Sequence, residues 1–166
     1  MIIGCKGRID MNDIIEEIRE ESPWLIFKLS EKSYTINSRT ITSIVIKPAE
    51  TTFVPNVSEH IVGLIHLRGK VVPLIDLKLL LNIKPVSDKH DDAKESKEMV
   101  VVLEKDNLIM GFIVDQVLSV ESITSYEETE EIKKMYDNGY VTGVAQGYKN
   151  DDVLLVIDEE KIMSNA

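Results

Sequence analysis

The chain has 166 residues, of which 43% are apolar and 29% charged, and its formal net charge is −10. This length is enough for one domain or two very small ones. The acidic balance argues against nucleic acid or anionic lipid as the main partner, because phosphates demand a basic surface. Cys5 is the single cysteine, so no disulfide can form within the chain. No apolar run approaches the roughly 20 residues of a membrane helix. We therefore expect a cytoplasmic protein without direct membrane insertion.

Residues 1–23 form an extension that differs from the rest of the chain. Its apolar residues recur at helical spacing with acids between them: Met11, Ile14, Ile15 and Ile18. This pattern predicts a short amphipathic helix over about 11–21, ended by Pro23. The helix either packs on its own domain or docks on a partner, and the sequence favours the first of these.

From residue 24 the pattern changes to short apolar runs of strand length. Three strands are predicted at 24–29, 34–37 and 41–46, and two more at 63–67 and 70–76 after a loop. A highly charged segment at 84–98 is predicted to be a solvated linker or loop.

The pattern then restarts. Strands are predicted at 99–103, 108–114, 117–120, 141–147 and 153–157, and a helix at 127–136.

The two strands within 63–77 are predicted to form a tight hairpin. Gly69 and Lys70 can make a two-residue type II′ turn, since glycine tolerates a positive φ at its first central position. Arg68 then precedes the turn and projects into water. Pro73 lacks an N–H for the ladder, which indicates an edge strand or a bulge. Asp76 can cap a helical turn by accepting a backbone N–H.

The halves 24–83 and 99–163 look alike, since both give five strands in the same order. Gly63 corresponds to Gly143, and Asp76 corresponds to Asp158. Five short strands are the number found in a small closed barrel. The sequence therefore predicts an all-β fold of two packed five-stranded barrels, with strand exchange between them left open.

The sequence offers few candidate catalytic or metal-binding residues. The three histidines, His60, His66 and His90, match no metal-ligand spacing, and no nucleophile motif or phosphate loop is evident. Asp76 and Asp158 could form a carboxylate pair, but capping is the better interpretation at their matched positions. We expect no catalytic residue, no cofactor and no metal. Arg68 is either a plain turn residue or an interface anchor.

Residues 61–77, IVGLIHLRGKVVPLIDL, resemble the signature of the CheW family. Further similarity lies in GFIVDQV at 111–117, YVTG at 140–143 and LVID at 155–158. The resemblance extends over about 24–163 and implies a CheW-like domain at 24–166.

This resemblance implies two five-stranded SH3-like barrels and a non-enzymatic adaptor. Such adaptors join chemoreceptor cytoplasmic tips to the regulatory domain of the histidine kinase CheA. Carried over, Arg68 matches the arginine tied to receptor coupling, and Ile41 and Val117 match apolar positions near the receptor-facing groove. His66 departs from the family pattern, which has Asn before Leu-Arg-Gly, and Ser43 stands where an acid is common.

Two alternatives stay open. The domain could serve as a scaffold module of another two-component pathway or of a larger protein. It could also be a small-ligand-binding or enzymatic β-barrel protein, which a deep polar pocket with perturbed titratable groups would indicate.

Overall fold

The computed structural model describes residues 23–84, 97–135, 139–147 and 153–165. The helix predicted at 11–21 and most of the charged segment lie outside these ranges. Among the described residues no helix is long and apolar enough to cross a membrane.

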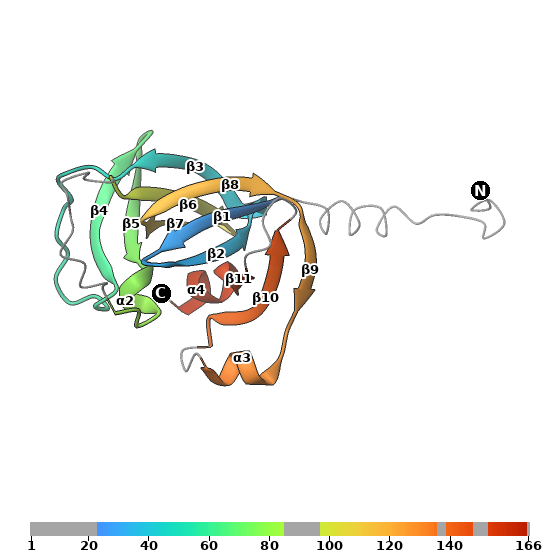
Figure 1. Cartoon of the computed structure of the whole chain (residues 1–166). Helices are drawn as coiled ribbons and strands as arrows, with labels where there is room; N and C mark the ends of the chain where they lie inside the picture. Colours follow the sequence, from blue (N-terminus) through green and yellow to red (C-terminus); the bar gives the residue numbers. More distant parts are fainter. Residues whose placement is uncertain (1–22, 85–96, 136–138, 148–152, 166) are drawn as a thin grey trace, which may run out of the picture.

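The described residues form two curved antiparallel-rich sheets with three short α-helices beside them (Figure 1). One sheet has five strands in the order β3-β6-β7-β5-β4: β3 Ile41–Ile46, β4 Ile61–Leu67, β5 Lys70–Asp76, β6 Met99–Lys105 and β7 Leu108–Val114. The other has six in the order β8-β1-β2-β11-β10-β9: β1 Trp24–Leu29, β2 Lys32–Asn37, β8 Gln116–Glu121, β9 Ile123–Glu127, β10 Val141–Gly147 and β11 Val153–Ile157. The helices are α2 Leu77–Leu80, α3 Glu130–Met135 and α4 Glu159–Asn165, and a 3₁₀ turn, η2, spans Ser38–Thr40.

Each sheet combines strands from both halves of the sequence. The first hairpin, β1-β2, pairs with β8 and β11 of the second half. The corresponding hairpin of the second half, β6-β7, pairs with β3 and β5 of the first. The sequence left such an exchange open, and the strand order shows that the leading hairpins lie in the opposite sheets.

The two halves of the sequence repeat share a break in strand register at corresponding positions. The register of β4 with β5 shifts between Ile61 and Gly63, and that of β10 with β11 shifts between Val141 and Gly143. A Cβ at Gly63 would lie 2.7 Å from Thr51 Oγ1, and one at Gly143 would overlap the carbonyl oxygen of Glu127. Glycine at these positions therefore permits the close approach of a neighbouring segment.

Alternation along the strands builds three hydrophobic clusters. The largest joins the two sheets and contains Leu25 and Phe27 from one, and Val101 and Leu103 from the other. Each sheet also buries apolar residues on its second face, in smaller clusters around Val100 and Ile26 respectively. The central strands are buried on both faces, which explains apolar runs such as 99–103.

The predicted turn at Gly69-Lys70 is wrong by one residue. Leu67 pairs with Lys70, so the loop is Arg68-Gly69, with φ of 51° and 79°. Two positive φ angles define a type I′ turn, whose twist fits the strands. Arg68 therefore occupies the turn itself, and its side chain is exposed as expected.

The edge-strand interpretation of Pro73 is also wrong, because β5 lies between β4 and β7. The N–H and C=O of Leu64, the residue opposite Pro73, bond to Thr52 instead of β5. Pairing with β7 begins only at Leu74. The missing N–H of Pro73 therefore interrupts neither ladder.

The helix predicted at 127–136 begins later than expected. The strand β9 was not predicted; it pairs with β10 and ends at Glu127, while α3 begins at Glu130. Local acidic composition favoured a helix start, but Ile123 packs against the cluster around Ile26 and Tyr126 stacks on Trp24. These tertiary contacts decide the strand.

Candidate protein-docking site

The edge strand β3 presents apolar side chains toward the large cluster that joins the sheets. Ile41 pairs with Leu103 and Ile44 with Val101, and both partners belong to that cluster. Residues paired across a ladder point to the same side of the sheet. Ile44 is nevertheless 38% exposed and Ile46, opposite Met99, is 56% exposed, because no further strand follows β3.

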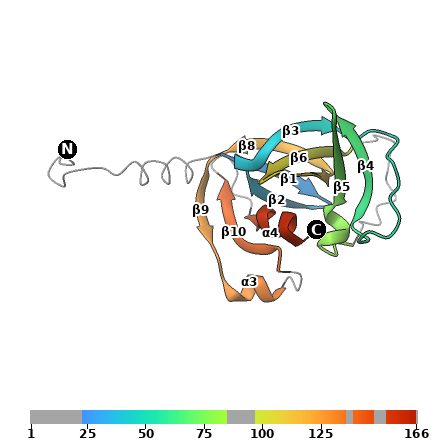
Figure 2. The same ribbon diagram turned by 180° about the vertical axis from the view of Figure 1, so that it is seen from behind.

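The edge strand β8 has the same arrangement in the other sheet. Val117 pairs with Phe27 and Val120 with Leu25, which again belong to the joining cluster. Val117 is half-buried against this cluster, while Val120 is 54% exposed. Both edge strands run along the same upper side of the molecule in the two views (Figures 1 and 2).

We call these side chains the edge patch, which comprises Ile41, Ile44, Ile46, Val117 and Val120. Its two parts are equivalent in the repeat. The register shifts between Ile41 and Ser43 in β3, and between Val117 and Ser119 in β8, so one residue bulges in each strand. The predicted site residues Ile41 and Val117 thus occupy matching positions beside the two bulges, and both pack against the joining cluster.

Arg68 is on a different element from Ile41 and Val117, at the tip of the β4-β5 hairpin. The neighbouring Lys70 forms an ion pair of 2.5 Å with Glu104 of β6. None of the ion pairs between described residues includes Arg68. Its exposed guanidinium is held on a type I′ turn, which fixes the backbone but not the side chain.

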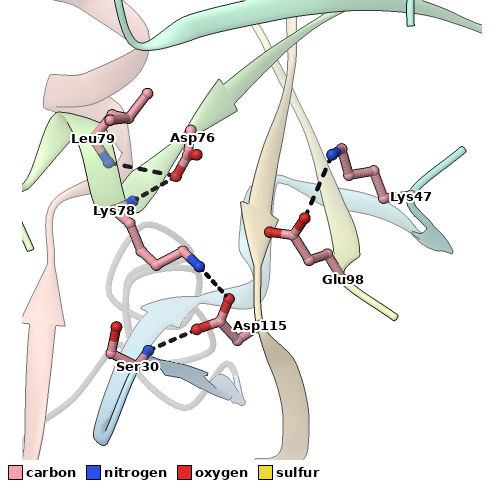
Figure 3. A network of polar contacts seen from close by, with 7 residues as sticks. All are labelled: Ser30, Lys47, Asp76, Lys78, Leu79, Glu98 and Asp115. Carbon is pink, nitrogen blue, oxygen red and sulfur yellow. Dashed lines mark hydrogen bonds and ion pairs between the residues drawn. The ribbon is translucent and has the colours of Figure 1, made fainter. Parts of the chain in front are cut away.

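A partly buried polar junction joins elements from both halves of the chain (Figure 3). Asp115, between β7 and β8, accepts a hydrogen bond of 2.7 Å from the N–H of Ser30 in the β1-β2 turn. Its other carboxylate oxygen lies 2.7 Å from Nζ of Lys78 in α2. The backbone N–H of Asp115 also bonds to the carbonyl of Lys28. Sequence reasoning did not identify this role of Asp115, because Ser30 and Lys78 are distant from it in the sequence.

The surroundings of Lys78 favour its positively charged form. Burial lowers its pKa, but the hydrogen bond to Asp115 and the nearby carboxylates of Asp115, Glu98 and Asp76 outweigh burial. The pKa of Lys78 is therefore raised, and the ammonium form persists into the alkaline range.

The two matched aspartates lie at helix starts. Asp76 Oδ1 accepts from the N–H groups of Lys78 and Leu79 at the start of α2 (Figure 3). Asp158 Oδ1 accepts from the N–H of Lys161 in α4. Each carboxylate satisfies donors that a helix start leaves free.

The histidines are not gathered at one place. His60 has a buried Nε2 without a partner in the described part of the chain, while His66 is exposed on β4. His90 lies outside the described residues. The described residues hold no group of three or more His, Cys, Asp or Glu that could bind a metal.

Sequence reasoning did not single out further exposed apolar side chains on the β3-β4 loop and β5. Phe53 is 79% exposed in the β3-β4 loop, and Val57 and Val71 are also exposed. A phenylalanine between two polar or β-branched neighbours in a loop was the available signal, because aromatic residues are enriched at protein interfaces.

Comparison with known proteins places these features in context. The chain matches the CheW-like domain family over residues 23–166. The chemotaxis protein CheW of Bacillus subtilis is 30% identical over 149 residues, which cover 89% of this chain and 90% of that one. The chemotaxis protein CheV3 of Helicobacter pylori is 30% identical over 139 residues, 81% of this chain but 42% of that longer protein.

A solved structure shares the fold. The crystal structure of the scaffolding protein TtCheW from Thermoanaerobacter tengcongensis matches with a TM-score of 0.67 and 28% identity. The match covers 83% of this chain and 89% of that chain.

The exchanged hairpins, the shared core and the open apolar edges define an all-β scaffold of two SH3-like barrels. The chain belongs to the CheW family and is a chemotaxis coupling adaptor. The fold class and the family predicted from the sequence are confirmed.

Proposed function

We propose that this chain is a non-enzymatic cytoplasmic adaptor that binds a chemoreceptor tip and the regulatory domain of the kinase CheA. The observation that carries the proposal is the edge patch: two equivalent edge strands whose apolar side chains face the joining cluster and yet remain exposed. Exposed apolar areas on soluble proteins mark interaction sites.

The receptor tip would dock on the edge patch. A chemoreceptor tip is a helical hairpin, and an amphipathic helix can lay apolar residues at positions i, i+3, i+4 and i+7 onto such a surface. Ile41 and Val117 would form the floor, since both pack against the core. Ile44 and Val120 would form the flanks, and Arg68 would anchor the rim from the β4-β5 turn.

The kinase domain would bind elsewhere on the five-stranded sheet. Phe53, Val57 and Val71 supply exposed apolar side chains there, on the β3-β4 loop and β5. Aromatic residues are enriched among side chains that dominate binding energy, so Phe53 is the expected anchor. Signalling would then follow when receptor motion biases the bound kinase.

Calorimetry with purified partners tests this assignment. Ile44→Ser combined with Val120→Ser should weaken binding of a receptor tip fragment by at least about tenfold, since two apolar contacts are lost. Arg68→Glu should weaken it as well. Binding of the CheA regulatory domain should stay within about twofold, and Phe53→Ser should give the reverse pattern.

Val153→Ser is the matched control, because Val153 is exposed on β11 outside both surfaces. It should change neither affinity. The proposal would be contradicted if the edge-patch variant lost affinity equally for both partners. It would also be contradicted if the unaltered chain bound neither partner.

The longer relative supports a second role for the same domain. CheV3 extends well beyond the matched region, so CheW-like domains also occur within larger chemotaxis proteins. If this chain is part of such a protein, the edge patch would serve the same docking within a larger scaffold.

A further inference from the structure

The N-terminal extension enters the fold beside the edge patch. Trp24, the first residue of β1, pairs with Glu121, the last residue of β8, and Leu25 pairs with Val120. Ser38 holds the carbonyl of Pro23 with its N–H at 3.1 Å and its Oγ at 2.6 Å. The point at which the first 22 residues join the fold is therefore fixed next to Val120.

The helix predicted within the extension is about as long as β8, the strand beside which the extension joins the fold. A helix over 11–21 would be about 16 Å long at 1.5 Å per residue. The six residues of β8 span about 20 Å. Because β8 runs antiparallel to β1, a helix that turns back at Pro23 would lie along β8 from its Glu121 end toward its Gln116 end.

The surface chemistry of the two segments is complementary. As a helix, the extension would repeat its apolar residues on one face, and three of its acids, Asp13, Glu16 and Glu20, would fall on the opposite face. The edge patch offers Val117 and Val120 where β8 has no further strand beside it. An amphipathic helix placed there would bury both apolar faces and leave its acids in water.

We propose that residues 11–21 fold as a helix onto the edge patch and compete there with the receptor tip. The packing itself is independent of the proposed function, whereas the competition rests on it. The tether keeps the helix at a millimolar effective concentration, so even weak packing occupies the patch. A segment docked for most of the time would lower the apparent receptor affinity about fivefold to tenfold.

Cysteine cross-linking within the full chain tests the packing without any partner. In a Cys5→Ser background, Val120→Cys is combined in turn with cysteine at Ile14, Ile15, Ile18, Asp13, Glu16 or Glu20. Disulfides should form at least about tenfold faster from the three isoleucine positions than from the three acidic positions. Glu20 is the decisive control, because it is the tested position closest to Trp24, where the chain enters the fold beside Val120, but it would lie on the face opposite the isoleucines.

A flat dependence on position would show that no helix packs there and would overturn the proposal. Disulfides between chains instead of within one chain would overturn it too, since a second copy would then be the occupant.

Receptor binding tests the competition. Ile15→Ser with Ile18→Ser should bind a receptor tip fragment about fivefold more tightly than the unaltered chain. The matched variant Glu16→Ser with Glu17→Ser should bind unchanged. Equal affinities for all three proteins would overturn the competition. If none of them binds the fragment, the proposed function fails, while the cross-linking pattern still decides whether the helix packs.

Discussion

At the scale of single residues, Glu159 is the group whose environment most opposes its charge. It lies in the first turn of α4 and is only 6% exposed. Burial raises its pKa to about 7, and the neighbouring Asp158 and Glu160 act in the same direction while Arg39 opposes them. The folded state therefore disfavours the carboxylate relative to the unfolded chain.

Glu159→Gln should accordingly stabilise the protein above about pH 4.5, with the full gain reached above about pH 7. The pKa is higher in the folded state than in the unfolded state, so the contribution of Glu159 to stability falls as the pH rises from about 4.5 to about 7. Replacing the ionised carboxylate should raise the unfolding free energy by about 2–3 kcal/mol at pH 8, since one pKa unit corresponds to 1.36 kcal/mol.

Denaturant titrations at several pH values measure this difference. At pH 4 the variant and the unaltered protein should be nearly equal, because Glu159 is protonated in both states. An equal gain in stability at pH 4 and pH 8 would mean that packing, rather than charge, is responsible. Glu31→Gln is the control, because Glu31 is exposed in the turn between β1 and β2, away from α4.

At the scale of elements, the Asp115 junction joins the β1-β2 turn, α2 and the start of β8 (Figure 3). These elements come from both halves of the chain, so the junction links the exchanged hairpin β1-β2 to strands of the opposite sheet. It lies at the end of β8 that begins with Gln116, next to Val117 of the edge patch.

A double-mutant cycle measures the strength of this junction. Lys78→Met and Asp115→Asn should show a coupling of about 1 kcal/mol, because the pair is partly desolvated and hydrogen-bonded. The coupling should persist until the pH approaches the raised pKa of Lys78 and should shrink in 1 M salt.

The ion pair between Lys47 and Glu98, at 3.4 Å and more exposed, is the matched control. Its coupling should be close to zero. A larger coupling for this pair than for Lys78 and Asp115 would contradict the special role of the junction.

At the scale of the whole molecule, the exchange of hairpins makes each sheet dependent on both halves. β2 pairs with β11 and β5 pairs with β7, so both parallel contacts join one half to the other. The joining cluster also draws residues from both sheets and from α4.

Fragments 24–83 and 99–163 should therefore not fold separately. Each should lack a cooperative unfolding transition, because its leading hairpin finds no partner strands within the same fragment. An equimolar mixture should regain native-like circular dichroism and cooperative unfolding. A fragment 24–83 that unfolds cooperatively by itself would show that the halves are independent domains.

Much of this architecture could be predicted from the sequence. The apolar runs predicted ten of the strands. A strand buried on one face alternates apolar and polar residues, and a strand buried on both faces is a short continuous apolar run. The motif around Gly63 and Asp76 identified the family, and its second appearance around Gly143 and Asp158 revealed the repeat. Ile41 and Val117 came from the family resemblance, since neither stands out in its own strand.

Other features depended on contacts between distant segments. β9 is a strand because Tyr126 stacks on Trp24 and the strand pairs with β10, whereas the sequence analysis placed no strand there and began a helix at its last residue, Glu127. The role of Asp115 required Ser30 and Lys78 to meet it in space.

The sequence by itself determined most of the local elements, the repeat and the family, because periodicity, turn residues and motif spacing are properties of neighbouring residues. Only the tertiary structure decided which hairpin lies in which sheet, and hence that β3 and β8 are edge strands. The physical reason is that either partner strand satisfies the same backbone hydrogen bonds. The choice between them depends on side chains packed across the whole core.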